Sequence, residues 1–281
     1  MSMHHKITIG GTELIALQDS WGWLAPGGFY VGVETEAWEP YREWVNDDGL
    51  TVHNYGCFLI NSGGKNILVD TGLGQWPNSL DLEQPPSLLD AMRAAGTDPV
   101  DIDLVLLTHL HWDHTGWNTR NDAGALELTF PNASYIVQQR EYDYWTSPGE
   151  KPSSKSDYDR VLAPLVAANR LEIVGGEYAA TNEVVAVPTP GHTPGHVSFA
   201  IVSGGERAYI LGDVANKPVQ VSEPEWYTTY DLDPVEATKS RRMILDRAEQ
   251  ENALIACGHF PHPSMGHIIE VNGRRSFHAV S

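Results

Sequence analysis

The same order of secondary-structure elements is predicted twice along this chain. Each half runs from a strand through a glycine turn to a second strand, then an aspartate, a helix and a third strand followed by histidine. In the first half these elements are predicted at residues 56–61, 62–64, 66–69, 87–95 and 102–107. In the second half they are predicted at residues 197–202, 204–205, 208–211, 234–250 and 253–257. The repetition predicts an α/β (α+β) fold, a pseudo-duplicated four-layer αββα sandwich of two mixed β-sheets with helices outside.

The remaining segments extend this sandwich. Hairpins are predicted near both ends of the chain, with strands at residues 6–9, 12–17, 268–271 and 276–278. Further strands are predicted at 134–138, 171–174 and 184–187, helices at 141–145 and 158–168, and an exposed loop at 148–157. A length of 281 residues is enough to bury a substantial core. We predict a single domain that spans residues 1–281.

Residues 19–55 differ from the rest of the chain because their aromatic side chains follow no regular period. Seven aromatic residues lie here among glycines and prolines: Trp21, Trp23, Phe29, Tyr30, Trp38, Tyr41 and Trp44. We predict a long loop region, and long loops in compact domains commonly form a lid, a binding wall or an interface. The region is expected to shape the substrate pocket or a homodimer interface. Burial of the aromatic rings at the edge of the core is the alternative.

A dense cluster of potential metal ligands follows the apolar strand predicted at 102–107. His109 and His111 stand two positions apart, so that in extended or loop backbone both imidazoles can point the same way. Asp113 and His114 follow on the next turn and can face a second point nearby. Structural zinc sites are closed by four ligands, often thiolates, whereas imidazole and carboxylate ligands leave room for water. The cluster therefore predicts a catalytic site for two metals.

Further ligand candidates lie at strand ends in the second half. The turn at residues 190–196 carries His192 and His196, of which we expect only one to reach a metal. Asp213 follows the strand at 208–211, and its carboxylate can bridge two cations if it faces the same end of the sheet as the first cluster. His259 follows the strand at 253–257 and the flexible Gly258. Each candidate alone is weak, but together with the first cluster they form a strong pattern.

The charge of the chain restricts its partners. The formal net charge of −19 argues against binding to nucleic acids or anionic membranes, because a protein that neutralises phosphates needs a positive face. Cys57 and Cys257 are far apart in sequence, and we expect two reduced thiols. Residues 1–15 lack the apolar core of a signal peptide. A cytoplasmic protein is therefore expected.

Four motifs together resemble the metallo-β-lactamase fold superfamily. They are HxHxDH at 109–114, TPGH ending at His192 or at His196, the Gly212-Asp213 pair and the GHF turn at 258–260. The resemblance spans roughly residues 56–259. It implies one metal held by His109, His111 and His196, and a second held by Asp113, His114 and His259.

The resemblance also implies roles for neighbouring residues. Asp213 would bridge the two metals, and Asp70 would orient a ligand imidazole. His192 would be the histidine of its turn that is not a ligand. The remaining histidines are assigned no ligand role: His4, His5, His53, His262, His267 and His278.

Two divalent metal ions give this site the chemistry of a hydrolase. Two cations lower the pKa of a bridging water until hydroxide is available near neutral pH. Zinc is the favoured metal, with iron, manganese and cobalt as alternatives. We expect this hydroxide to attack an electrophilic centre of a small-molecule substrate. Asp113 is expected to pass a proton to the leaving group, so Asp113 and Asp213 are the predicted catalytic residues.

Several segments are most similar to a branch that holds N-acyl homoserine lactonases and organophosphate triesterases resembling methyl parathion hydrolase. They are THLHWDHTGWN at 108–118, EYDYWT at 141–146, GDVANKPVQ at 212–220 and YDLDP at 230–234. We therefore expect hydrolysis of a lactone or carboxylic ester, with phosphotriester hydrolysis as the alternative. A second alternative is an iron-dependent oxygenase or oxidoreductase on the same scaffold, since these ligands also suit iron.

One position departs from the lactonase pattern. Some lactonases carry a tyrosine three residues after the bridging aspartate, where it is thought to touch the substrate carbonyl. This chain has Asn216 there, and Tyr227 or Tyr230 would have to substitute from the following loop.

Overall fold

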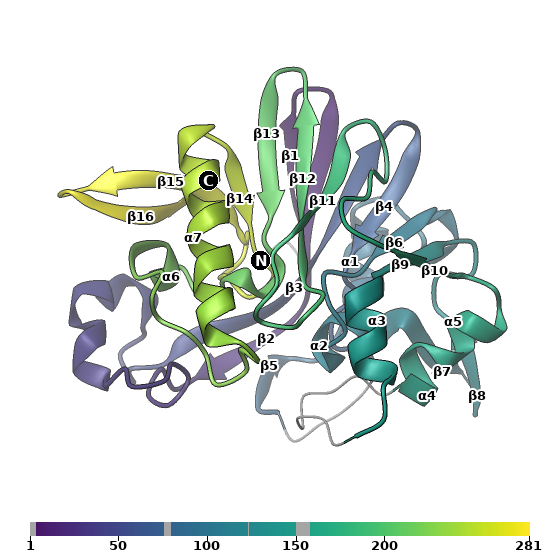
Figure 1. Ribbon diagram of the computed structural model, residues 1–281, viewed down its shortest axis with the longest axis horizontal. Helices are drawn as coiled ribbons and strands as arrows, with labels where there is room; N and C mark the ends of the chain where they lie inside the picture. The colour runs from purple at the N-terminus through teal and green to yellow at the C-terminus, as the bar shows by residue number, and fades with distance from the viewer. Residues whose placement is uncertain (1–3, 76–79, 123, 150–157) are drawn as a thin grey trace.

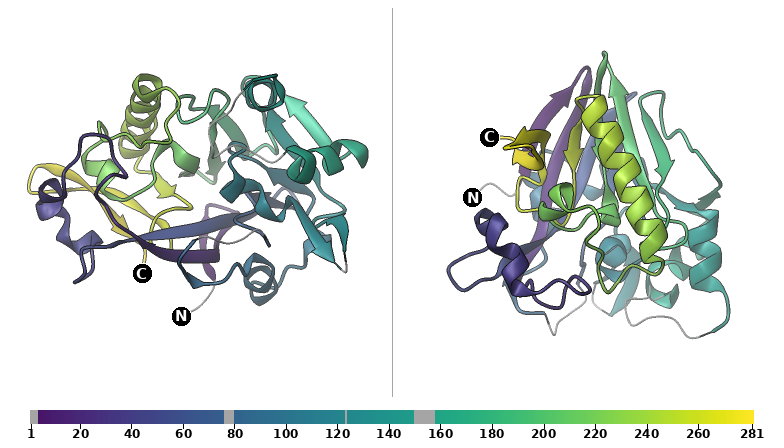
Figure 2. Two further views of the ribbon diagram at one scale, coloured as in Figure 1. Left: turned by 90° about the horizontal axis from the view of Figure 1, so that it is seen from below. Right: turned by 60° about the vertical axis from the view of Figure 1, so that its left-hand side comes forward.

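Two β-sheets pack face to face in this protein, with helices on their outer sides (Figure 1; Figure 2). The computed structural model describes residues 4–75, 80–122, 124–149 and 158–281. Within these ranges, the larger sheet has eight strands and the smaller has six. The predicted fold, a sandwich of two mixed sheets with helices outside, is confirmed.

The first sheet is mixed. Its strand order is β1 (His4–Ile9), β2 (Thr12–Leu24), β3 (Thr51–Ser62), β4 (Lys65–Val69), β6 (Leu104–Leu106), β9 (Ser134–Gln138) and β10 (Leu171–Val174), with β5 (Leu82–Gln84) paired to β2. The strands from β1 to β4 are antiparallel, and those from β4 to β10 are parallel. Because the carboxyl ends of parallel strands meet at one edge, the loop after β6 opens at the edge where ligands collect in α/β folds.

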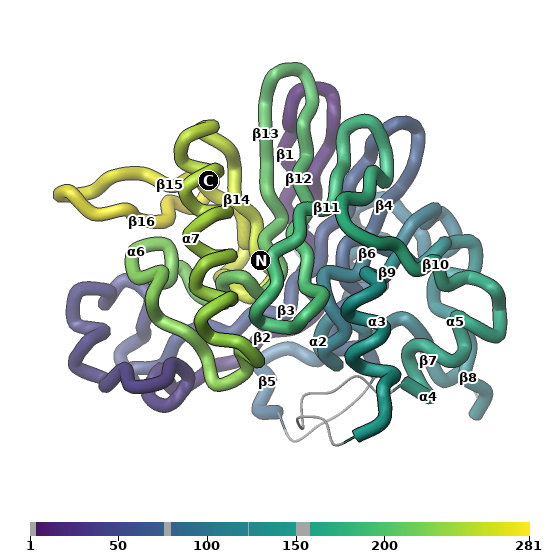
Figure 3. The backbone as a smooth tube through the Cα atoms, viewed as in Figure 1, coloured from purple at the N-terminus to yellow at the C-terminus, as the bar shows by residue number. Residues whose placement is uncertain are grey.

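The second sheet is shorter and mainly antiparallel. Its order is β11 (Val184–Pro188), β12 (Val197–Ser203), β13 (Glu206–Ile210), β14 (Leu254–Ala256), β15 (Met265–Val271) and β16 (Arg274–Ala279), of which only β13 and β14 run parallel. A separate hairpin joins β7 (Thr119–Asp122) and β8 (Ala125–Leu128). The hairpin tips β1–β2 and β12–β13 lie side by side (Figure 3), where the Gly11 amide donates to the Ser203 hydroxyl over 3.1 Å.

Helices and short 3₁₀ turns complete the outer layers. The α-helices are α1 (Leu88–Ala94), α2 (Trp112–Thr115), α3 (Gln139–Thr146), α4 (Tyr158–Val161), α5 (Ala163–Ala167), α6 (Val219–Ser222) and α7 (Pro234–Gln250). The 3₁₀ turns are η1 (Thr35–Trp44), η2 (Pro99–Asp101), η3 (Gly116–Asn118) and η4 (Gly212–Val214). In the described parts of the chain, no helix is both long and apolar enough to cross a membrane.

Alternation along β3 shows how one strand contributes to two apolar layers. Phe58 and Ile60 pack in the central layer between the two sheets. Cys57 and Leu59 point the other way and pack against the α1 side. Successive side chains of a strand face opposite sides, and because both sides of the sheet are covered here, residues 57–60 form an uninterrupted apolar run.

The aromatic region at 19–55 is more regular than we predicted from its sequence. β2 continues to Leu24, β3 begins at Thr51, and η1 lies between them. A β-bulge between Gln18 and Ser20 shifts the register, so the alternation that marks a strand breaks where β2 enters this region. The rings of Phe29, Tyr30, Trp38 and Tyr41 are buried in a satellite core with Val219.

Two smaller differences concern residues 148–168. The helix predicted at 158–168 is divided into α4 and α5, because Pro164 has no amide hydrogen and is accommodated only in the first turn of a helix. The loop predicted at 148–157 lies mostly outside the described residues.

Candidate metal centre

The predicted ligand-bearing segments converge at one edge of the sandwich. His109 and His111 lie in the loop after β6, and Asp113 and His114 lie in α2. The second sheet contributes the turn before β12, the η4 turn after β13 and the loop after β14. Strands from both halves therefore deliver histidines and carboxylates to the same buried space, as the repeated order of elements predicted.

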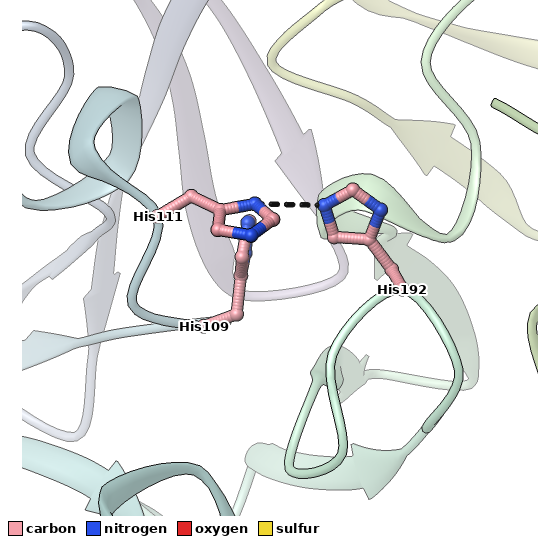
Figure 4. Close-up of side chains that lie close together, drawn as sticks. All are labelled: His109, His111 and His192. Carbon is pink, nitrogen blue, oxygen red and sulfur yellow. Dashed lines mark hydrogen bonds between the residues drawn. The ribbon is translucent and has the colours of Figure 1, made fainter. Parts of the chain in front are cut away.

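The first imidazole group consists of His109, His111 and His192, whose nearest ring nitrogens all lie within 4.8 Å of one another (Figure 4). His192 Nε2 is 3.0 Å from His111 Nδ1. Nε2 of His109 is buried and has no hydrogen-bond partner. A buried polar atom without a partner is costly unless a ligand satisfies it, so this nitrogen fits the role of a metal ligand.

The second imidazole group consists of Asp113, His114 and His259. Nε2 of His114 lies 3.3 Å from Nε2 of His259, and Asp113 Oδ2 lies 3.5 Å from the same His259 nitrogen. Asp213 stands between the two groups, with Oδ1 3.2 Å from His114, and Oδ2 3.2 Å from His259 and 3.4 Å from His192. Its two oxygens can therefore serve both groups.

Hydrogen bonds on the far side of three rings fix which nitrogen faces the site. The Nδ1 atoms of His114, His192 and His259 each lie 2.8 Å from an oxygen, of Asp70, Asp231 and the Asn54 carbonyl respectively. An ionised carboxylate or carbonyl can only accept, so each Nδ1 carries the proton. In the neutral ring the Nε2 lone pair then faces the site, which is the arrangement that metal-binding histidines use.

Electrostatics favour a cation at this point. Burial lowers the pKa of His109 and His111 well below their usual range, so both rings are neutral. Burial alone would raise the pKa of Asp213, but His259 and His114 hold it well below its usual range. Burial would likewise lower the pKa of His114, yet Asp213 and the neighbouring carboxylates raise it well above. The neutral imidazoles of His109 and His111 beside the ionised carboxylate of Asp213 are a donor set that fits a divalent metal.

His196 does not occupy the position that the resemblance implied. The structure brings His192, rather than His196, beside His109 and His111. Nδ1 of His196 lies 2.9 Å from the Thr189 hydroxyl, and Nε2 accepts the Asp213 amide over 2.9 Å. With both nitrogens engaged, His196 holds the turn that carries Asp213 and has no free lone pair for a metal.

Two buried networks that were not predicted hold the histidine loops. Glu141 accepts from the Leu110 amide at 2.9 Å and the Gly195 amide at 3.0 Å, and thus ties the two loops together. The approach is so close that a Cβ on Gly195 would lie 2.2 Å from the Glu141 amide nitrogen. Asp231, which accepts from His192, pairs through its other oxygen with Arg241 at 3.3 Å. The EYDYWT and YDLDP segments carry these carboxylates, but only their resemblance to a family marked them in the sequence.

A cleft of about 390 Å³ opens above the two groups. Asp113, Asp213 and His259 line it on the metal side. Its apolar walls include Trp23, Leu24, Phe29, Tyr55, Trp112 and Tyr230. Among the described residues that line the cleft there is no lysine or arginine.

The comparisons with known proteins agree with this geometry. Residues 51–259 match the model of the metallo-beta-lactamase superfamily, so the chain belongs to that superfamily. The N-acyl homoserine lactonase AttM of Agrobacterium fabrum is 26% identical over 220 residues, covering 75% of this chain and 80% of the relative. An N-acyl homoserine lactonase of Bacillus thuringiensis is 25% identical over 218 residues, covering 72% and 80%. The chain is therefore a distant relative of the lactonase-like branch.

Solved structures show the same fold over the whole chain. The hydrolase AbOPH of the beta-lactamase superfamily superposes with a TM-score of 0.86 at 25% identity, covering 100% of this chain and 98% of that one. AidC, a dizinc quorum-quenching lactonase solved with the product N-hexanoyl-L-homoserine, gives a TM-score of 0.84 at 23% identity, covering 100% and 99%. The resemblance predicted from the motifs is thus confirmed at the level of family and fold.

Proposed function

We propose that this protein is a dinuclear metal-dependent hydrolase of lactones or carboxylic esters. One observation carries the proposal: two imidazole groups share Asp213 at the base of a cleft with apolar walls. The first metal would be held by His109, His111 and His192, and the second by Asp113, His114 and His259, with Asp213 between them. His192 thus replaces His196 in the ligand set.

The chemistry follows from the donor set and the surrounding side chains. Two divalent cations, zinc by preference, would supply a nucleophilic hydroxide near neutral pH and polarise the substrate. Asp113 keeps 14% of its side chain exposed, against 6% for Asp213. It therefore faces both the second group and the cleft, where it can hold a proton and give it to the leaving group.

The cleft favours an uncharged substrate with an apolar group. Apolar walls with a few convergent polar groups are typical of small-molecule sites. Substrates with a carboxylate, such as β-lactam antibiotics, would find no cationic partner among the described lining residues. The sequence relatives named N-acyl homoserine lactonases support a lactone, which is neutral at its reacting end.

Phosphotriester hydrolysis is a second candidate. Trp23, Tyr55 and Trp112 in the cleft wall suit an aryl leaving group, and an uncharged phosphotriester meets the same electrostatic requirement. An iron-dependent oxygenase on this scaffold is a candidate from a different class of function. It stays a candidate because histidine and carboxylate ligands also bind iron.

Metal analysis with a substrate panel tests the proposal. The panel contains a γ-lactone, an aryl ester, an aryl phosphotriester, a β-lactam and a thioester, each assayed with zinc-loaded protein. Two metals per chain and turnover of the lactone or aryl ester are expected. Preferred turnover of the phosphotriester would move the assignment to the second candidate. One iron per chain with oxygen consumption would replace hydrolysis by oxygenase chemistry.

We also propose that the chain forms a single domain and that it assembles as a homodimer. Both sheets contribute to one site, which supports a single domain over residues 1–281. A homodimer through the aromatic region would show in gel filtration as an apparent mass that depends on concentration.

A further inference from the structure

His53 lies beside the second imidazole group, although no ligand role was assigned to it from the sequence. Its ring stacks on His259, with centroids 4.3 Å apart and planes inclined by 25°. One of its ring nitrogens lies within 4.8 Å of His259 and Asp113 ligand atoms. His53 also lines the cleft. It therefore stands where a bound substrate would meet the second metal.

Lys217 holds the other side of this ring. The lysine side chain comes from the loop before α6, is fully buried, and places Nζ 2.8 Å from His53 Nδ1. Nζ also donates to the carbonyl oxygen of Val52 and lies 5.7 Å from the centre of the Phe29 ring. A carbonyl oxygen and the face of an aromatic ring both attract N–H groups rather than a lone pair. We take Lys217 as an ammonium, although burial lowers its pKa well below the usual range. An ammonium has three N–H groups, one each for the Val52 carbonyl, the Phe29 face and His53 Nδ1.

This contact decides the tautomer of His53. With the Nδ1 lone pair occupied by a lysine proton, a neutral ring must carry its own proton on Nε2. A ring whose Nδ1 accepts a hydrogen bond cannot be an imidazolium, which carries protons on both nitrogens. Nε2 is then an N–H donor and has no lone pair for a metal. His53 differs in this respect from His114 and His259, whose Nδ1 atoms face acceptors.

Asn216 is held by the bridging carboxylate. One N–H of its amide Nδ2 donates to Asp213 Oδ2 over 2.9 Å, and its Oδ1 is buried without a partner. The orientation of this amide is therefore set by Asp213. Tyr230 lines the cleft as well, but 49% of it is exposed, so its hydroxyl is poorly fixed.

We propose that His53 is a catalytic residue whose Nε2–H donates a hydrogen bond to the carbonyl or phosphoryl oxygen of the substrate, and that Lys217 is the positioning residue that fixes this tautomer. The inference rests on the proposed hydrolase function. A fixed donor aimed at an oxygen that gains negative charge in the transition state accelerates acyl transfer because it needs no reorganisation during the reaction. No bond of His53 forms or breaks, and its proton remains on Nε2.

Activity and metal content of His53→Phe test the donor role. Loss of one preorganised donor lowers kcat by about 100-fold, with KM changed little and two metals per chain retained. His53→Gln, whose amide nitrogen reaches the Nε2 position, is expected to recover part of this loss. The matched control His278→Phe replaces an exposed histidine of β16 and should leave kcat unchanged. A fall to one metal per chain in His53→Phe would show a metal ligand instead, and unchanged kcat would remove the donor role.

Nitrogen NMR of ¹⁵N-histidine-labelled, zinc-loaded protein tests the tautomer without any substrate. The wild type is expected to show the His53 proton on Nε2, whereas Lys217→Met should move it partly to Nδ1 and lower kcat. Lys239→Met is the matched control on the exposed face of α7 and should change neither. A wild-type proton on Nδ1 would overturn the inference. Absence of turnover on the whole substrate panel would instead overturn the proposed function, which separates the two failures.

Discussion

The two imidazole groups are similar in composition but are supported in different ways. In the first group, His192 is oriented by Asp231, which is itself paired with Arg241, and both of these side chains are fully buried. In the second group, His259 is oriented by a backbone carbonyl and covered by the neutral ring of His53. A buried ion pair thus supports His192, whereas a backbone carbonyl supports His259; the other histidine of the second group, His114, is oriented by Asp70. Both groups border the cleft, the first through His111 and His192 and the second through Asp113 and His259.

Asp213→Ala should have the largest effect, because this carboxylate lies within 3.4 Å of ligands in both groups. Loss of the shared charge removes several kcal/mol of stabilisation from each metal, so turnover should fall on the order of 10⁴-fold. Metal analysis after dialysis should give fewer than two metals per chain. Retention of both metals at full affinity would show that the groups are independent.

His192→Ala and His196→Ala form a matched pair. The first removes a proposed metal ligand, and the second removes a histidine that holds the turn carrying Asp213. Removal of His192 should empty the first group and lower turnover on the order of 10³-fold. Removal of His196 should leave two metals bound, because its nitrogens hold Thr189 and the Asp213 amide instead. The measurement is metal stoichiometry together with kcat. Loss of metal from His196→Ala alone would restore the ligand set that the family resemblance implied.

Asp113→Asn tests proton transfer by a residue of the second group alone. The amide keeps the size of the side chain but cannot carry a proton, so kcat should fall about 100-fold while KM changes much less. Steady-state kinetics on the preferred ester, with metal content measured in parallel, checks this. Unchanged turnover with both metals present would exclude Asp113 as the proton carrier.

The sequence was sufficient for the fold because the central strands of both sheets are buried on two sides. Strand β9 is a short, largely buried apolar run, and α7 begins at a proline with Asp233 as its N-cap, so their limits were predicted from local signals alone. The continuation of β2 beyond Gln18 was missed because the bulge there shifts the register and breaks the alternation by which a strand is recognised.

The site was less predictable where distant residues decide the outcome. His192 and His196 share one turn, and the choice between them depends on Asp231, which is 39 residues away from His192. The tautomer of His53 depends on Lys217, 164 residues along the chain. Neither contact has a local pattern, whereas the cluster from His109 to His114 has its ligands within six consecutive residues.

Asp231→Asn should weaken metal binding less than loss of a ligand does, and it tests the charged support of His192 directly. An asparagine can still accept from His192 through its oxygen, but the ring loses a carboxylate partner, so metal affinity should fall about 10- to 100-fold. Arg241 would lose its only carboxylate partner among the described residues, and breaking a buried pair in this way costs about 3–5 kcal/mol of folding stability. Asp246→Asn is the matched control, since Asp246 pairs with Arg275 at the surface and such pairs contribute about 0–1 kcal/mol. Metal titration of each variant together with denaturant unfolding separates the two effects. If Asp231→Asn bound both metals with wild-type affinity, the buried charges would support only the fold, and the two groups would not differ in how their metals are held.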